Sequence, residues 1–137
     1  MKRKQEPQLH YGDGKTWLRG SMIGQGTFGC VYLATLKKPN SRYSYLPPTM
    51  AVKSAEVSVS ASLQKEIEVL YNLQGCHHVV NCFAEEITSG EHGEMIYNLL
   101  LEYASGGTLA DLIEKSDGCG LPEFVVRRYV RSMIQQY

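Results

Sequence analysis

A glycine-rich stretch near the N-terminus, Ile23-Gly-Gln-Gly-Thr-Phe-Gly-Cys-Val-Tyr-Leu33, constrains the fold more than any other part of the sequence. It places Gly24, Gly26 and Gly29 in the pattern G-x-G-x-x-G, with β-forming residues on both sides. Glycine lets backbone N–H groups approach a phosphate and permits positive φ angles in a tight turn. The stretch therefore predicts two strands joined by a glycine turn that could hold a phosphate.

Other nucleotide-binding patterns fit this stretch poorly. In a dinucleotide-binding fold the third glycine opens a helix, whereas here Cys30 to Leu33 favours a strand. The Walker A pattern needs Gly-Lys-Ser/Thr, which is absent after the loop. Instead the chain continues to the apolar strand Met50-Ala51-Val52-Lys53, and then to an amphipathic helix that carries Glu66.

The helix is predicted to run to about Leu73, with Ser60 or Ser62 as its N-terminal cap. Four apolar residues recur at the spacing of one buried face. They are Leu63, Ile67, Leu70 and Tyr71.

Glu66 lies on the edge of that apolar face, where an unpaired carboxylate is costly. Lys53 is its natural partner, although a lysine at the end of an apolar strand is ordinarily just solvated. Glu68 is the alternative partner, but its position in the helix points more toward solvent.

A glycine loop, a strand lysine and a helix glutamate in this order resemble the N-terminal lobe of a protein kinase. Residues 99–109 resemble the fifth strand, the hinge and the next helix of that family, so the resemblance covers about residues 17–137. Two further matches are similar to MAP kinase kinase kinases, especially the plant-type members. They are Trp17-x-Arg19-Gly20 with the adjoining glycine loop, and Leu101-Glu102-Tyr103-x-x-Gly106-Gly107.

This resemblance implies an α+β fold: a kinase-like N-terminal lobe with a five-stranded antiparallel sheet and one long helix, a hinge, and the first helices of a truncated C-terminal lobe. We expect a flexible tail over residues 1–15, the lobe over 16–101, the hinge over 102–107 and the start of the C-terminal lobe over 108–137. The expected strands are 16–23, 31–36, 50–55, 79–85 and 95–101, and the later helices are 108–115 and 122–137.

The resemblance also implies a binding site for ATP. Lys53 would contact the α- and β-phosphates, and Glu66 would hold that lysine by an ion pair; these are the implied catalytic residues. Apolar side chains would enclose the adenine, and two hinge positions would hydrogen-bond its edge through their backbone. The apolar residues are Ile23, Val31 and Ala51, with Leu101 at the back of the pocket, and the hinge positions are Glu102 and Ala104. The glycine loop over the phosphates comprises Gly24, Gln25, Gly26, Thr27, Phe28 and Gly29.

Two smaller patterns have alternative interpretations. Asp111 lies three residues after Thr108, as in a helix capping box, but it could also contact a ribose hydroxyl. Four residues over 76–82 could suggest a metal site, but their spacing matches no usual zinc pattern, and no metal site is predicted. They are Cys76, His77, His78 and Cys82.

Composition limits the partners and the location. Fourteen basic and fourteen acidic residues balance, so there is no general attraction to nucleic acid or to an anionic membrane. The sequence has no apolar run of membrane-spanning length and no apolar signal-peptide core. Its four cysteines lack paired spacing, which indicates reduced thiols in the cytoplasm. The basic cluster over residues 2–4 could be part of a nuclear signal, which leaves the nucleus as a second location, but a solvated tail explains it more simply.

Three functions are consistent with these patterns. The first is part of a serine/threonine kinase of the MAP kinase kinase kinase type, with ATP, Mg²⁺ and a protein substrate, itself a downstream kinase. The second is a non-catalytic nucleotide-binding or interaction module. The third is an unrelated β-rich binding domain in which the glycines only form turns. Tight ATP binding without Mg²⁺ would favour the second, and no nucleotide binding would favour the third.

Phosphoryl transfer in the kinase family uses an aspartate in His-Arg-Asp, an asparagine, and a Mg²⁺-binding aspartate in Asp-Phe-Gly. The 137 residues contain three aspartates, Asp13, Asp111 and Asp117, and none lies in either motif. The ligands for Mg²⁺ are therefore not present in this chain. We expect the polypeptide as given to be inactive on its own.

This expectation is tested by incubating the purified 137-residue chain with labelled ATP, Mg²⁺ and a protein acceptor. No phosphate should be transferred, because the chain has no aspartate placed as a base. Transfer that disappears with Lys53→Met would contradict the prediction.

Overall fold

The computed structural model describes residues 16–37 and 46–134 of the chain. Within them lie five strands and three α-helices. The strands are β1 (Trp17–Gln25), β2 (Cys30–Leu36), β3 (Thr49–Glu56), β4 (Cys82–Ser89) and β5 (Met95–Glu102). The helices are α2 (Ala61–Asn72), α3 (Leu109–Lys115) and α4 (Glu123–Ile134), and a short 3-10 helix, η2 (Val57–Val59), precedes α2. The predicted tail over 1–15 and the end of the last helix at Tyr137 lie outside the described residues.

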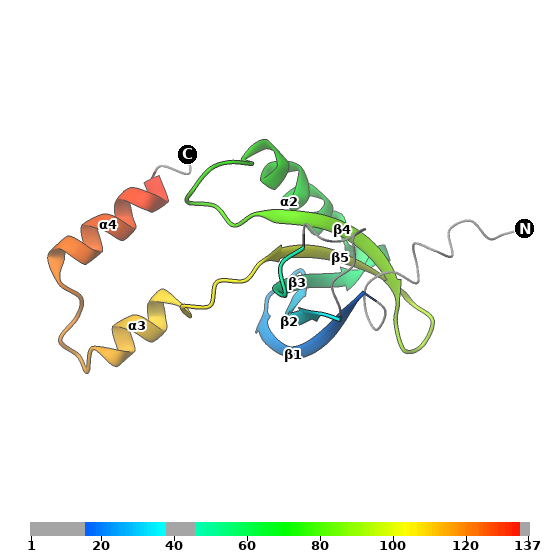
Figure 1. The fold of residues 1–137 in the computed structure, drawn as a ribbon, viewed down its shortest axis with the longest axis horizontal. Helices are drawn as coiled ribbons and strands as arrows, with labels where there is room; N and C mark the ends of the chain where they lie inside the picture. Colours follow the sequence, from blue (N-terminus) through cyan, green and yellow to red (C-terminus); the bar gives the residue numbers. More distant parts are fainter. Residues whose placement is uncertain (1–15, 38–45, 135–137) are drawn as a thin grey trace, which may run out of the picture.

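The strands form one antiparallel sheet in the order β1-β2-β3-β5-β4. Helix α2 lies against one face of this sheet, and the chain then leaves the end of β5 toward α3 and α4 (Figure 1). The predicted α+β fold, with a five-stranded antiparallel sheet, one long helix and two later helices, is confirmed. The exact boundaries of lobe and hinge stay a prediction.

Each face of the sheet carries its own apolar core. The core on the side of α2, here called the helix face, comprises Ala51, Leu63, Ile67, Cys82, Tyr97, Leu99 and Leu101. The core on the opposite side, here called the outer face, comprises Trp17, Ala34, Leu46, Met50, Val52 and Leu100. Alternate residues of β3 and β5 contribute to the two cores, as expected for strands covered on both sides.

The predicted bounds of β4 were wrong, since the strand begins at Cys82 rather than at residue 79 and continues to Ser89. Residues before it are held in turns, with the Cys76 N–H donating to Leu73 O at 3.0 Å. At the other end, Thr88 is buried and accepts a hydrogen bond from the side chain of Asn98. The strand is therefore defined by its contacts with β5, which its own sequence does not reveal.

Helix α2 begins after Ser60, but the predicted cap is wrong in its chemistry. The Ser60 hydroxyl makes no side-chain cap bond to the helix backbone. It donates instead to Val57 O at 2.9 Å and accepts from Gln64 Nε2 at 2.8 Å. The helix start is thus joined to η2, which the sequence did not predict. Of the predicted apolar face, Leu63 and Ile67 are buried, whereas Tyr71 at its end is exposed.

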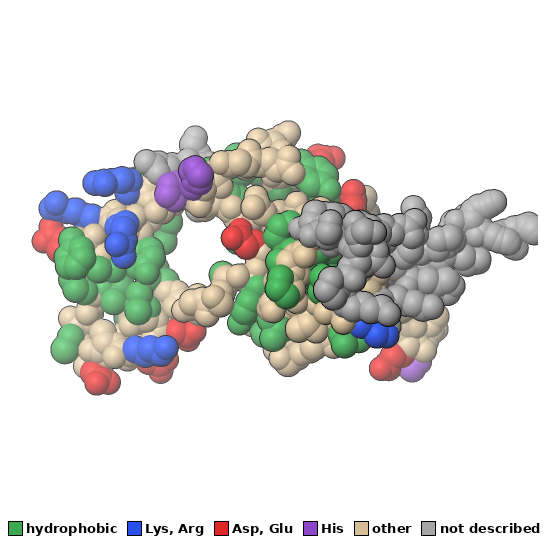
Figure 2. All heavy atoms as spheres, viewed as in Figure 1, with side chains coloured by type: hydrophobic (Ala, Val, Ile, Leu, Met, Phe, Trp, Pro, Cys, Tyr) green, Lys and Arg blue, Asp and Glu red, His purple; other side chains and the backbone are tan. Residues whose placement is uncertain are grey.

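Helices α3 and α4 expose apolar side chains over much of their surface (Figure 2). Those of α4 form the predicted stripe, of which Val126, Val130, Met133 and Ile134 are described. No helix in residues 16–37 or 46–134 is long and apolar enough to cross a membrane.

Burial determines the chemistry of one thiol in the sheet. Cys82 lies in the helix-face core, and burial raises its pKa to about 11, with nearby Glu85 and Glu66 adding to the shift. A backbone hydrogen bond with Ala84, two residues along β4, partly opposes this shift. Cys119, in contrast, is exposed.

We predict that Cys82 stays unmodified when the native protein is treated with a maleimide at about pH 8, where only roughly one thiol in a thousand with this pKa is ionised. Cys119 should be modified, and Cys82 should react only after unfolding in urea. Peptide mapping by mass spectrometry distinguishes the two sites. Equal modification of both in the native protein would contradict the assigned burial.

Candidate functional site

The glycine turn joins β1 to β2 and is closed by one backbone hydrogen bond, from Gly26 N to Gly29 O at 2.9 Å. The reason for its third glycine is close approach to β3. A Cβ built at Gly29 would lie 2.9 Å from the carbonyl oxygen of Ser54, too short for any side chain without a backbone shift. The same atom at Gly26 would meet nothing nearer than 3.9 Å.

Positive φ angles, which the sequence also suggested for this turn, are not used there. The described glycines with positive φ are Gly75, Gly93, Gly107, Gly118 and Gly120. The three glycines of the turn therefore have no positive φ angle, and packing against β3 explains the glycine at position 29.

The neighbouring strands bring several predicted residues onto the helix face. Lys53 pairs with Val31 on one side and with Leu99 on the other. Two residues earlier along β3, Ala51 pairs with Leu101. Because directly paired residues point to the same side of an antiparallel sheet, the lysine and its apolar neighbours share one surface.

The predicted ion pair is present. Lys53 Nζ lies 3.0 Å from Glu66 Oε1, and the two side chains are 28% and 35% exposed. Glu68 is exposed on α2, as the sequence predicted for the alternative partner. A pair this accessible to water contributes at most about 1 kcal/mol to stability. The main role of the ion pair is therefore to orient Lys53, whose ammonium group it holds above the sheet.

The remaining loop residues are placed at the edge of this surface. Ile23, Gly24 and Gln25 end β1, and residues 26–29 form the turn itself. Phe28 is 61% exposed at the tip. A cavity of about 320 Å³ lies between the turn and the end of β3, lined by residues 26–30, 54–56 and Val59.

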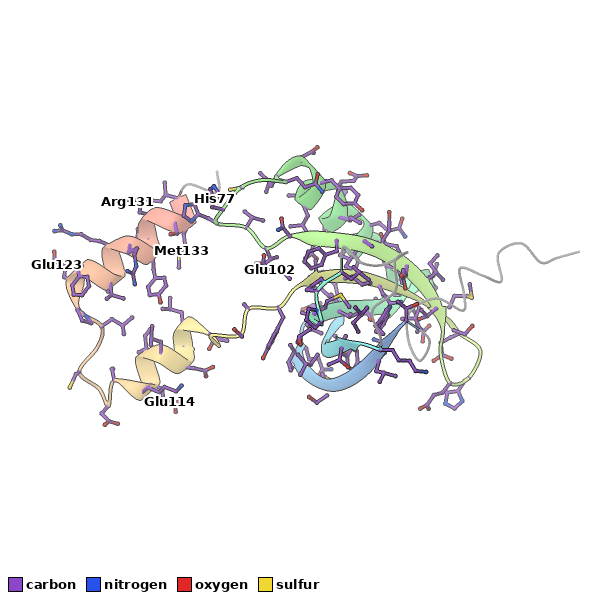
Figure 3. The ribbon with its side chains drawn as sticks, in the orientation of Figure 1. His77, Glu102, Glu114, Glu123, Arg131 and Met133 are labelled. Carbon is purple, nitrogen blue, oxygen red and sulfur yellow. The ribbon has the colours of Figure 1, made fainter. Side chains whose placement is uncertain are left out.

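At the other end of the sheet, Glu102 closes β5 where the chain leaves toward α3 (Figure 3). Its N–H donates to Asn81 O at 2.9 Å, and its carboxylate accepts from Asn81 N at 3.0 Å. The donor of Glu102 is thus already used, which leaves its carbonyl as the backbone group to offer a ligand. Ala104 lies just beyond it in an extended, exposed segment.

Asp111 completes the predicted capping box of α3. Its N–H donates to Thr108 Oγ1 at 3.0 Å, and its carboxylate accepts from Thr108 N at 3.2 Å. Hydrogen bonds to the carboxylate from the backbone and the side chain of Thr108 lower the pKa of Asp111. The helix-cap interpretation therefore accounts for this residue.

The cysteines and histidines over residues 76–82 differ in burial and do not lie in one common environment. Cys82 is buried inside β4, whereas His77 and His78 are exposed in the preceding loop. In the part of the chain that the structure describes, no group of three or more His, Cys, Asp or Glu side chains could hold a metal ion.

Sequence reasoning missed a polar network on the outer face. Arg19, Ser54 and Asn98 lie far apart in the chain and hydrogen-bond to one another. One signal was available: Asn98 is the polar exception in the otherwise apolar run from Tyr97 to Leu101.

Comparison with known proteins gives a consistent result. The family described as the protein kinase domain matches residues 17–136. Mitogen-activated protein kinase kinase kinase 20 of Arabidopsis thaliana is 43% identical over 119 residues, which are 87% of this chain and 34% of that protein. Mitogen-activated protein kinase kinase kinase 17 of the same plant is 34% identical over 119 residues, covering 87% and 30%. Mitogen-activated protein kinase kinase kinase 3 of Mus musculus is 33% identical over 123 residues, covering 87% and 18%. The chain thus spans about a third or less of the length of these relatives.

The close approach of the turn to β3 makes a testable prediction. Gly29→Ala should lower the free energy of unfolding by about 1–3 kcal/mol, because the new Cβ must displace the backbone of Ser54. Gly26→Ala is the matched control, and should be neutral or stabilise by up to about 1 kcal/mol. Urea unfolding of both variants measures the difference. Equal effects would show that the turn does not pack against β3 as described.

Proposed function

Because the chain belongs to the protein kinase family, we propose that it forms the ATP-binding portion of a serine/threonine kinase of the MAP kinase kinase kinase type. The observation that carries this proposal is the Lys53–Glu66 ion pair, on a strand whose backbone packs against a glycine turn. An ammonium group held in place next to a tightly packed glycine turn is suited to an anionic phosphate chain.

The residues present fit ATP at both of its ends. At the phosphate end, Gly29 leaves no room for a side chain, so the backbone of the turn stays close to β3 and Lys53 supplies the positive charge. At the base end, Val31, Ala51 and Leu101 give the helix face an apolar surface of the kind that holds a flat ligand. Ile23 extends that surface from β1, and it is half exposed.

In this proposal each polar group has a separate task. Lys53 binds the α- and β-phosphates, and Glu66 orients its ammonium group and keeps it from swinging into solvent. The carbonyl of Glu102 and the backbone of Ala104 bind the edge of the base. ATP would supply the phosphoryl group, and a protein serine or threonine would receive it.

The wider reaction and its setting are also proposed. The kinase family uses Mg²⁺ with ATP, although the described residues assign it no ligands. The names of the relatives describe kinases that act on kinase kinases, so we propose a downstream kinase as the protein substrate. We place the protein in the cytoplasm, with the nucleus as a second location. The four cysteines without paired spacing support a reducing compartment.

We predict that Lys53→Met weakens ATP binding by roughly 10- to 100-fold, the loss expected when a charged hydrogen bond worth about 1.5–3 kcal/mol is removed. Lys65→Met, one residue from Glu66 on the exposed side of α2, is the matched control and should change nothing. Equilibrium dialysis of the purified chain with labelled ATP gives both dissociation constants. The same loss in both variants would point to a general charge effect and overturn the site.

A second pair of variants tests the orienting role of the carboxylate. Glu66→Gln should weaken ATP binding by about two- to fivefold, since it removes the ion pair but keeps the lysine. Glu68→Gln, the alternative partner on the same helix, should leave binding unchanged. A larger effect from Glu68→Gln would reassign the partner of Lys53.

A further inference from the structure

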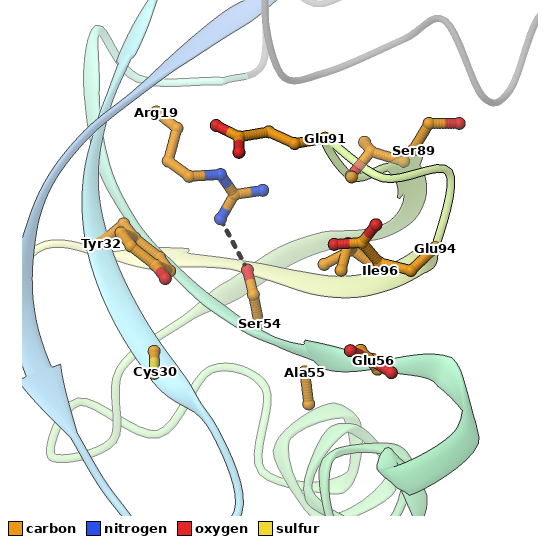
Figure 4. A pocket seen from close by; sticks show the side chains of 12 residues that line it. Arg19, Cys30, Tyr32, Ser54, Ala55, Glu56, Ser89, Glu91, Glu94 and Ile96 are labelled. Carbon is orange, nitrogen blue, oxygen red and sulfur yellow. Dashed lines mark hydrogen bonds between the residues drawn. The ribbon is translucent and has the colours of Figure 1, made fainter.

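Arg19 extends from β1 across the outer face of the sheet (Figure 4). Its guanidinium lies 5.2 Å from the ring centroid of Trp17 and 4.8 Å from that of Tyr32. Its Nη1 donates to Ser54 Oγ at 2.9 Å, and its Nη2 donates to Asn98 Oδ1 at 3.0 Å. A single side chain of β1 is thereby tied to β3 and β5.

The network continues from there to the far edge of the sheet. Ser54 Oγ donates to Asn98 Oδ1 at 2.6 Å, and Asn98 Nδ2 donates to Thr88 Oγ1 at 3.0 Å and to Glu86 O at 3.1 Å. The Glu86 carboxylate accepts from Trp17 Nε1 at 3.1 Å, which returns the network to β1. Side chains of β1, β3, β5 and β4 are therefore linked behind the surface that carries Lys53.

Because this network is buried, each of its polar groups needs a hydrogen-bond partner within the protein. Asn98 is fully buried, and Ser54 and Thr88 are nearly so. A buried polar group that loses its partner costs about 1–3 kcal/mol. The strands can therefore take up only an arrangement in which the donors and acceptors of these three residues meet.

The network is coupled to the nucleotide face through Ser54. This residue is next to Lys53 in the chain, and its carbonyl oxygen is the atom that Gly29 packs against. Its partner Asn98 precedes Leu99, which pairs with Lys53. Ser54 thus touches the glycine turn through its backbone and the outer-face network through its hydroxyl.

The backbone pairing of β1 with β2 does not by itself determine the position of the glycine turn. Its register shifts twice on the way to the turn, between Arg19 and Met22 and again between Met22 and Gly24. Each shift is a point at which the strand could be displaced relative to its partner. Arg19 lies at the start of this irregular part and binds across to β3 directly.

We propose that Arg19 is a positioning residue of the nucleotide site, which sets the glycine turn and Lys53 relative to each other through Ser54 and Asn98. This inference rests on the proposed function, because its effect is exerted on ATP. Arg19 lies on the opposite face of the sheet and does not touch the nucleotide. Removing it loosens the turn against β3, so that the phosphates are held less well.

The test compares Arg19→Met with Arg127→Met, which removes an exposed arginine of α4 whose ion pair with Glu123 is distant from the sheet. ATP affinity is measured by equilibrium dialysis at a temperature where circular dichroism shows each variant to be folded. Arg19→Met should weaken ATP binding by about fivefold, equivalent to about 1 kcal/mol, and Arg127→Met should not change it. The ATP affinity of Arg19→Lys should lie between those of the wild type and Arg19→Met. A lysine keeps the positive charge, but it lacks the two guanidinium N–H groups that bind both acceptors at once.

Trp17 gives a second readout, since it is the only tryptophan of the chain and stacks on Arg19. Addition of ATP should change its fluorescence in the wild type and in Arg127→Met, and the change should be lost in Arg19→Met. If Arg19→Met does not fold, Ser54→Ala replaces it. That variant removes the hydroxyl but leaves the Arg19–Asn98 bond, and it should weaken ATP binding by about two- to threefold.

The outcomes separate the inference from the function on which it rests. Unfolding at a lower temperature with unchanged ATP affinity would mean that Arg19 only stabilises the sheet, and would overturn the inference. ATP binding that is lost in Lys53→Met but kept in Arg19→Met and Ser54→Ala would do the same while leaving the proposed function intact. No ATP binding by the wild type would overturn both.

Discussion

Side chains alternate between the two faces of β3, and the arrangement of the whole sheet depends on that alternation. Val52 is fully buried in the outer-face core and Ser54 is bonded within it, while Lys53 between them points to the helix face. A slip of one residue would exchange the two faces. It would place the lysine in an apolar core and the buried valine beside α2. The position of Lys53 on the helix face is therefore determined by the burial of Val52 and Ser54 on the outer face.

Because burial already sets the position of Lys53, a weak ion pair is enough to orient its side chain. The bond between Lys53 and Glu66 is shared with water and contributes at most about 1 kcal/mol. Burial of a residue such as Leu63 or Ile67 contributes about 1.5–3 kcal/mol each, so the cores fix α2 against the sheet. The ion pair only selects the orientation of two side chains that are already near each other. Loss of the ion pair would accordingly change the orientation of Lys53 without loosening the fold.

Local patterns in the sequence were sufficient to predict the five strands, the three α-helices and the ion pair, but not η2. The glycine turn, the i and i+4 spacing of α2 and the edge position of Glu66 depend only on residues close in the chain. The bounds of β4, the bonds of Ser60 and the reason for Gly29 depend on partners from other elements. The outer-face network is the extreme case, since Arg19 and Asn98 are 79 residues apart. No pattern within one strand indicates such a partner.

Asn98 shows why a polar residue is placed within an apolar strand. An apolar side chain at this position would bury well in several registers, because one aliphatic contact replaces another at little cost. The amide is more selective: Nδ2 needs acceptors from β4, and Oδ1 needs donors from β1 and β3. Sliding β4 by two residues would preserve the faces but take away the β4 acceptors of Nδ2, and sliding β1 would take away the Arg19 donor to Oδ1. The Asn98 amide thus fixes the positions of both edge strands, β1 and β4, relative to the central strands. The position of the glycine turn follows, because the turn lies at the end of β1.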